Sequence, residues 1–166
     1  MDANYVFTDK NYLVKYLYTR LSNPTQIKVQ KTLYLLYAFY GATYGKIKDN
    51  SEESDFEGQE YPKELFPANF EAWRYGPVEV DVYNSEKLGE YKNSSDTELD
   101  NGTPEMKNII EFTNNIVEQT DSIDDFGLVD RTHQDDCWLD LYREGILHIK
   151  MINDDIIEEY AQKYVV

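Results

Sequence analysis

Apolar residues between positions 24 and 44 follow two helical stripes instead of one. The first stripe contains Val29, Leu33, Leu36 and Tyr40, and the second contains Ile27, Tyr34, Tyr37, Ala38, Gly41 and Tyr44. A helix that is apolar on nearly every side is buried in a domain or a membrane. Its tyrosine hydroxyls and its polar first turns, with Lys28, Gln30 and Lys31, favour a protein interior. The pattern therefore predicts a central buried helix over about 24–44, around which the rest of the chain packs.

Residues at both ends of this segment are typical of helix boundaries. Asn23 is a suitable N-cap, and Pro24 suits the first helical position, where its missing N–H costs nothing. Gln26 completes the spacing of a capping box. Gly45 is predicted to supply the left-handed residue that often closes a helix. We therefore expect the central helix to begin after Asn23 and to end at Gly45.

Helical spacing of apolar residues recurs elsewhere in the chain. We predict helices over about 9–21, 103–120 and 153–163, with N-caps at Asp9, Thr103 and Asn153. A turn and the start of a short helix are expected in 122–128. The chain is thus expected to form one compact, mostly α-helical domain spanning residues 1–166.

Two segments are compatible with strands. The run V-E-V-D-V that follows the Gly76-Pro77 turn alternates with period two, which is typical of a strand. The same residues could instead form a helix that begins at Pro77 and continues to Leu88. Residues 146–152 alternate weakly and could form a short strand. A small β-hairpin is therefore compatible with the mostly helical fold.

Two long segments lack any apolar period. Residues 46–64 are rich in Asp and Glu, and residues 89–103 contain the turn-forming sequences N-S-S-D and D-N-G. Runs of like charge without apolar periodicity are typical of solvated segments. We expect acidic loops at about 46–64 and 89–103.

The charge of the chain restricts its partners. It has 32 acidic residues against 16 basic residues, and a formal net charge of −16. Such a field repels nucleic-acid phosphates, so we expect no direct binding of DNA or RNA. It favours a basic partner or a protein that itself binds nucleic acid, although an acidic surface can also serve solubility alone.

Composition also bears on the cellular compartment. Cys137 is the single cysteine, which excludes an intramolecular disulfide. The N-terminus has no basic start followed by an apolar run, and no segment has 18 uncharged apolar residues. We therefore expect a cytoplasmic protein that does not cross a membrane.

The candidate chemistry is limited. His133 lies close in sequence to Asp135, Asp136 and Cys137, but the spacing H-x-D-D-C matches no zinc pattern. We expect His133 to be a structural histidine that bonds the backbone of a neighbouring helix near Trp138. Paired carboxylates such as Asp135-Asp136 point in different directions on a helix, and we interpret them as solvated charges. No nucleophile motif or phosphate loop is present, so we expect no catalytic residue, metal or cofactor.

The sequence W-R-Y-G-P at 73–77 allows two readings. It could be a tight turn whose aromatic rings pack on the central helix, or it could be a surface for a partner, because Trp, Tyr and Arg dominate binding hot spots. We expect Trp73 to be the more buried residue and Arg74 the more exposed. The candidate partner-binding residues are Trp73, Arg74, Tyr75, Gly76, Pro77, His133 and Trp138.

Four motifs occur in an order that resembles the Panacea domain family, which includes SocA-like and phage-associated GepA-type proteins. They are K-V-Q-K-T-L-Y-L-L-Y-A-F-Y-G-A-T-Y-G at 28–45, F-E-A-W-R-Y-G-P-V-E-V-D-V-Y at 70–83, V-D-R-T-H-Q-D-D-C-W at 129–138 and I-N-D-D-I-I-E-E-Y at 152–160. Cys137 and Val80 stand where the family usually has proline. The resemblance favours the helix rather than the strand after Pro77.

The resemblance implies a compact helical antitoxin without catalytic activity, in a family often carried by phages or prophages. Such a protein neutralises a toxin encoded beside it, or acts as an adaptor that hands the toxin to a AAA+ protease. The acidic composition supports a second hypothesis, in which the chain is a phage-encoded inhibitor. Its surface would imitate nucleic acid and block a host nuclease or another DNA- or RNA-binding protein.

Overall fold

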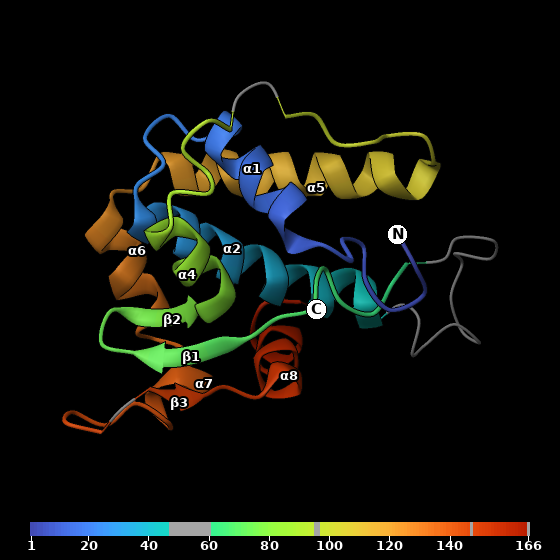
Figure 1. Ribbon diagram of the computed structural model, residues 1–166. Helices are drawn as coiled ribbons and strands as arrows, with labels where there is room; N and C mark the ends of the chain where they lie inside the picture. Colours follow the sequence, from blue (N-terminus) through green and yellow to red (C-terminus); the bar gives the residue numbers. More distant parts are fainter. Residues whose placement is uncertain (47–60, 95–96, 147, 166) are drawn as a thin grey trace.

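The computed structural model describes residues 1–46, 61–94, 97–146 and 148–165. Helix α2 (Gln26–Tyr40) runs through the middle of the molecule (Figure 1). Helices α1 (Lys10–Arg20) and α5 (Pro104–Asp121) lie on one side of it, and a small sheet lies on the other. All buried positions of α2 from Leu33 to Ala38 belong to one hydrophobic core. The prediction of a mostly helical chain around a central buried helix is confirmed.

The N-cap of α2 was predicted wrongly. The cap is Thr25 rather than Asn23, and its hydroxyl oxygen accepts from the Lys28 N–H at 3.1 Å. The same hydroxyl donates to Asp125 at 2.7 Å, at the start of α6 (Asp125–Thr132). This contact with a segment 100 residues away selects Thr25 over the equally suitable Asn23.

The predicted left-handed closure at Gly45 is also wrong. The helix continues from α2 into a π-helical turn, η1 (Gly41–Gly45), and Gly45 does not have a positive φ. The two glycines permit close packing instead: a Cβ on Gly41 would lie 2.6 Å from Ile157, and one on Gly45 would collide with the carbonyl of Lys63. Glycine is thus required for the approach of other segments rather than for a helix end.

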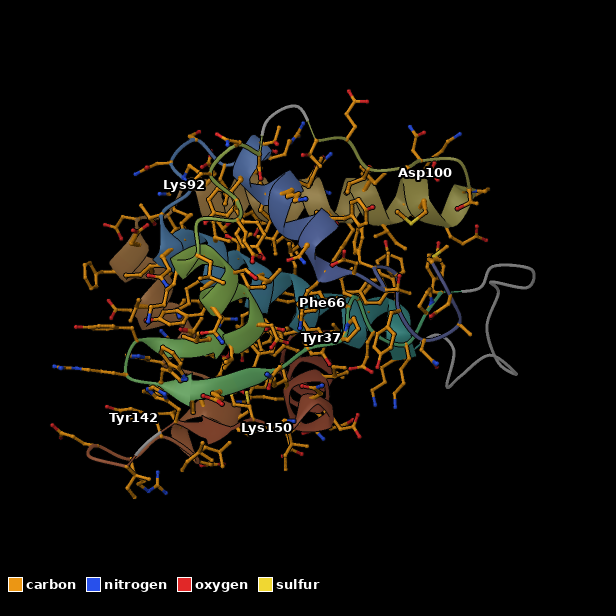
Figure 2. The ribbon with its side chains drawn as sticks, viewed as in Figure 1. Tyr37, Phe66, Lys92, Asp100, Tyr142 and Lys150 are labelled. Carbon is orange, nitrogen blue, oxygen red and sulfur yellow. The ribbon has the colours of Figure 1, made fainter. Side chains whose placement is uncertain are left out.

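The tyrosines of α2 form the centre of the core. Tyr34, Tyr37 and Tyr40 are completely buried. The rings of Tyr37 and Phe66 are 5.2 Å apart, and Figure 2 shows both in the interior of the molecule. Each hydroxyl has an acceptor, which is Asp135, Glu64 or the carbonyl of Pro62. These bonds remove the cost of burying three phenolic groups.

The remaining helix boundaries follow the sequence closely. Asp9 caps α1, and Thr103 caps α5 with Pro104 at the first position, as predicted. Helix α8 (Asn153–Lys163) differs, because its N-cap is Ile152 and Asn153 is the first helical residue. Asn153 Nδ2 donates to the carbonyl of Ala68 at 3.1 Å, so this side chain joins α8 to the segment before β1 instead of capping the helix.

The segment after the Gly76-Pro77 turn combines the two predicted alternatives. Strand β1 (Phe70–Trp73) pairs with β2 (Gly76–Glu79), and α4 (Val80–Lys87) begins immediately afterwards. The helix therefore does not start at Pro77. Glu79 is the residue at which the strand ends and the helix begins. Its backbone is in register with Phe70, while its carboxylate caps α4 by accepting from the Asp81 N–H at 2.9 Å.

A third strand completes the sheet, which has the order β2-β1-β3 and is antiparallel. Strand β3 (Ile149–Lys150) lies within the segment 146–152 that was predicted as a short strand. Helix α7 (Asp136–Leu139) and α8 lie on the same side of the molecule as this sheet (Figure 1).

Both predicted acidic loops contain packed residues. Residues 47–60 lie outside the described part of the chain, but Tyr61 and Glu64 at the end of the first loop are described. Tyr61 is buried, and Glu64 accepts from the Tyr37 hydroxyl. In the second loop, the buried ring of Tyr91 stacks on Tyr18 at 5.5 Å. A single aromatic residue therefore anchors a segment that looks solvated in sequence.

Candidate functional site

Five of the candidate partner-binding residues, 73–77, form the tip of the β1–β2 hairpin, while His133 at the end of α6 and Trp138 in α7 contact it from other elements. Trp73 is in register with Gly76, so Arg74 and Tyr75 form the two-residue turn between the strands. Arg74 and Tyr75 are exposed, Trp73 is partly buried, and Gly76 and Pro77 are buried. The expected contrast between Trp73 and Arg74 is confirmed.

Three side chains from other elements hold backbone carbonyls of this turn. The Trp138 indole N–H donates to the Trp73 carbonyl at 2.8 Å, and the Lys31 ammonium donates to the Pro77 carbonyl at 3.0 Å. His133 Nε2 lies 3.0 Å from the Arg74 carbonyl. Because a carbonyl can only accept, this nitrogen carries the proton. The backbone of the turn is therefore fixed by side chains of other elements, while the side chains of Arg74 and Tyr75 remain exposed to a partner.

His133 thus has the structural role expected of it, near Trp138, with one correction. His133 bonds the backbone of the hairpin turn and not of a neighbouring helix. Its ring stacks on Trp138 with centroids 4.1 Å apart, and Trp138 stacks on Tyr142 at 4.8 Å. Burial is the main reason why the pKa of His133 is lowered, and the nearby charge of Lys31 lowers it further.

Close packing explains the glycine in this turn. Gly76 has a φ of +105°, which side chains rarely adopt. A Cβ there would lie 2.5 Å from the Thr132 hydroxyl and 3.1 Å from Lys31 Cε. Only glycine allows the hairpin to rest on α6 and on Lys31 together.

The exposed face of the turn extends to a residue that the sequence did not indicate. Phe126 of α6 is 63% exposed, and its ring lies 6.3 Å from Tyr75, edge to face. The Arg74 guanidinium lies 5.6 Å from the Tyr75 ring centre. We call Arg74, Tyr75 and Phe126 the turn patch. The available signal for Phe126 was the period of α6, which buries Leu128, Val129 and Thr132 and leaves Phe126 on the outer face.

A groove of about 280 Å³ opens beside the turn patch. Its apolar walls are Ile27, Trp73, Tyr75, Val78 and Tyr83, and its remaining lining residues are Gln26, Gln30, Lys31, Arg74 and His148. No Asp or Glu is among them. Apolar clefts with a few polar groups are typical of ligand and partner sites.

His148 takes part in one wall of this groove. Its ring stacks on Trp73 with centroids 3.8 Å apart, while Tyr83 meets Trp73 nearly edge-on at 4.7 Å. His148 therefore belongs to a three-ring cluster with Trp73 and Tyr83. The chain separates His148 from Trp73 by 75 positions, so the sequence carries no direct signal of the contact.

Lys31 is the most unusual ionisable residue of the groove. It is 1% exposed, and within the described part of the chain its ammonium has the Pro77 carbonyl as its one hydrogen-bond acceptor. Burial without a compensating anion lowers its pKa to about 7. The first turns of α2 had been predicted to be polar, but Lys28, Gln30 and Lys31 are all buried against backbone carbonyls.

Asp135 is a second buried charge, and the sequence misplaced it as a solvated residue. It is completely buried, and it accepts from the hydroxyls of Tyr34 at 2.6 Å and Tyr160 at 2.5 Å. Arg131 Nη1 donates to it at 3.0 Å. Through Asp135, these bonds join α2, α6 and α8 to one another.

Asp135, Cys137 and Glu159 bring possible metal ligands within 4.8 Å of one another, and His133 is not part of this group. Glu159 already accepts from the N–H groups of Asp136 at 2.9 Å and Cys137 at 2.6 Å, and it pairs with Lys163 at 3.1 Å. Burial raises the pKa of the Cys137 thiol well above its usual range. The arrangement therefore serves to cap α7 rather than to offer free ligands.

Comparison of the chain with family models, with curated proteins and with solved structures gave no match. The resemblance to the Panacea domain family therefore stays a prediction that rests on the four motifs. Among the described residues, none of the helices combines the length and the apolar character needed to cross a membrane.

Proposed function

We propose that this chain is an antitoxin-like protein of the cytoplasm that acts by direct binding and not by catalysis. It neutralises a toxic partner encoded beside it, or hands that partner to a AAA+ protease. The observation that carries the proposal is the turn patch, which exposes Arg74 and Tyr75 on a backbone held at three carbonyls and the ring of Phe126 beside them. The same segment carries the motif F-E-A-W-R-Y-G-P, on which the family resemblance depends.

The fixed turn supports this proposal energetically. Ordering a flexible loop on binding costs free energy, and a surface that is already ordered avoids most of that cost. Arginine and large aromatic residues are the groups that most often dominate binding energy. The turn patch combines these residue types with a preorganised backbone.

The net charge supports a basic partner. A charge of −16 attracts a cationic protein over distances of about 10 Å at 0.1 M salt. Such attraction accelerates association and weakens as salt rises. The two aromatic rings of the turn patch then supply short-range contacts that salt affects little.

Co-expression with the neighbouring open reading frame tests the proposal. We expect the neighbour to stop growth alone and the intact chain to restore it, whereas Tyr75→Ala combined with Phe126→Ala restores it poorly. Tyr12→Ala is the matched control, because Tyr12 is 62% exposed and lies on α1. A neighbour that is harmless alone, or that remains lethal with the intact chain, would contradict the proposal.

The charge alone favours a second candidate, an acidic inhibitor that imitates nucleic acid. Such an inhibitor would capture a DNA- or RNA-binding protein and would be displaced by DNA. Its affinity should fall steeply between 50 and about 300 mM salt, because the contacts are mainly electrostatic. Binding that does not change with salt would exclude this candidate and leave the turn patch as the binding surface.

A further inference from the structure

The groove beside the turn patch has walls suited to a flat ring. Trp73 stacks on His148 and meets Tyr83 nearly edge-on, and Tyr75 and Val78 continue the apolar lining. Aromatic rings bind other rings by stacking and edge-to-face contact. The groove thus offers aromatic and apolar walls to a planar apolar group, and its volume of about 280 Å³ limits that group to a small size.

The charge of the groove is opposite to that of the molecule. Two of its lining residues, Lys31 and Arg74, carry basic side chains, and none is acidic, although the chain has twice as many acidic as basic residues. Within the described part of the chain neither Lys31 nor Arg74 forms an ion pair with a carboxylate. The Arg74 guanidinium, together with a Lys31 amine that can take up a proton, is complementary to an anion.

The start of α2 adds to this preference. Gln26 and Ile27 line the groove and are the first two residues of that helix. Thr25 caps the N–H of Lys28, so the first two N–H groups have no partner within the helix. The positive end of the helix dipole therefore acts in the same direction as Lys31 and Arg74.

We propose that the groove binds a small planar aromatic carboxylate, with its ring against Trp73 and Tyr83 and its carboxylate toward Arg74, Lys31 and the start of α2. This activity goes beyond partner binding and does not depend on it. Because the site adjoins the turn patch, a bound acid would lie where it can affect a partner seated there.

Binding of such an acid is coupled to a proton. Free Lys31 has a pKa lowered to about 7, so it is largely neutral at pH 8. A carboxylate nearby favours the ammonium form, and the complex takes up a proton that the free protein lacks. Affinity therefore rises as pH falls from 9 toward 6 and then becomes constant. Within the described part of the chain, His133 is the charged or titratable neighbour that interacts with Lys31 directly, and Arg74 and His148 line the same groove. Among the described residues, Glu71 is the nearest carboxylate to the groove wall: it lies 3.9 Å from His148 Nδ1 and accepts from the Trp73 indole at 2.9 Å.

Calorimetric titration of the full chain with 2-naphthoate and with its uncharged amide tests the proposal between pH 6 and 9. We expect the acid to bind at least about 10-fold more tightly than the amide at pH 6, which is about 1.4 kcal/mol. We also expect uptake of up to one proton at pH 8, measured in buffers that differ in ionisation enthalpy. Absence of acid binding, or equal binding of acid and amide, would overturn the proposal.

Three kinds of variant assign the effect to residues. Lys31→Met should abolish the proton uptake and make the affinity for the acid independent of pH. Arg74→Gln should lower the affinity for the acid at every pH and retain the proton uptake. His133→Gln and His148→Gln separate histidine protonation from that of Lys31. His148→Gln removes a ring from the groove wall and should weaken binding of the aromatic acid, but both variants should keep the proton uptake. Lys15→Met, which removes an exposed charge on α1, should change nothing. A Lys31→Met protein that binds as the unmodified chain does would refute the assignment.

Discussion

Asp135, which contacts α2, and Lys31, which belongs to α2, are both buried ionisable residues, yet they have very different hydrogen-bond partners. Asp135 accepts from two tyrosine hydroxyls and from Arg131, which come from three helices. Lys31 has one neutral carbonyl as its partner among the described residues. The first arrangement is what a structural centre requires, and the second weakens the fold. An uncompensated charge beside an apolar groove is therefore a candidate for function.

Removal of Asp135 should produce the largest change in stability. In Asp135→Ala, Arg131 and the hydroxyls of Tyr34 and Tyr160 lose their shared acceptor, and we expect the free energy of unfolding to fall by about 3–5 kcal/mol. Urea denaturation measures the difference. The matched control is Asp136→Ala, which removes an exposed ion pair with Lys163 and should cost at most about 1 kcal/mol. Similar losses in both variants would contradict the central role of Asp135.

Substitution in the hairpin that packs on Lys31 should cause the next largest loss of stability. Gly76→Ala combines a strained positive φ with a Cβ 2.5 Å from Thr132, and we expect a loss of about 2–3 kcal/mol. Gly145 also has a positive φ, of +80°, but nothing lies within 4 Å of a Cβ there. Gly145→Ala should therefore show the backbone strain alone, about 1 kcal/mol. Equal losses would mean that the close approach to α6 adds nothing.

Replacement of Lys31 should have an effect that depends on pH. The pKa of Lys31 is about 7 in the folded chain, below the unfolded value of about 10.4, so the unfolded state holds a proton that the folded state releases. Stability therefore rises with pH above 7, by up to about 1.4 kcal/mol per unit. Lys31→Met lacks the destabilising burial of the ammonium, so its free energy of unfolding should exceed that of the unmodified chain most clearly at pH 6. The same advantage at pH 6 and pH 9 would contradict it.

A second buried lysine on the same helix provides the comparison. Lys28 donates to the carbonyls of Thr120 and Ile123 at the end of α5. Its ammonium lies at the negative end of that helix dipole. We expect Lys28→Met to lower stability at pH 7 by about 1–3 kcal/mol, because buried carbonyls lose their donor. The two substitutions thus remove the same side chain with opposite results.

The turn patch should have the smallest effect on folding. Tyr75 and Phe126 are 48% and 63% exposed, and Tyr75→Ala or Phe126→Ala should change the free energy of unfolding by less than about 1 kcal/mol. Thermal or urea unfolding checks this expectation. A loss as large as that of Asp135→Ala would mean that these rings support the fold instead of a partner.

The sequence by itself determined the features that depend on near neighbours in the chain. The two apolar stripes of α2, the cap at Asp9 and the Thr103-Pro104 start of α5 all involve residues within one or two helical turns. The W-R-Y-G-P segment was recognised for the same reason, because its residues are adjacent. Side-chain period and capping geometry are local, so they can be read along the chain.

Only the tertiary structure decided which polar groups became buried and with what partner. Lys31 meets a carbonyl 46 positions away, Tyr34 meets Asp135 101 positions away, and Phe126 joins Tyr75 from another helix. Thr25 was preferred over Asn23 as N-cap for a similar reason, through its bond to Asp125. Whether a charge is compensated depends on such distant contacts, because hydrogen bonds and desolvation act through space and not along the sequence.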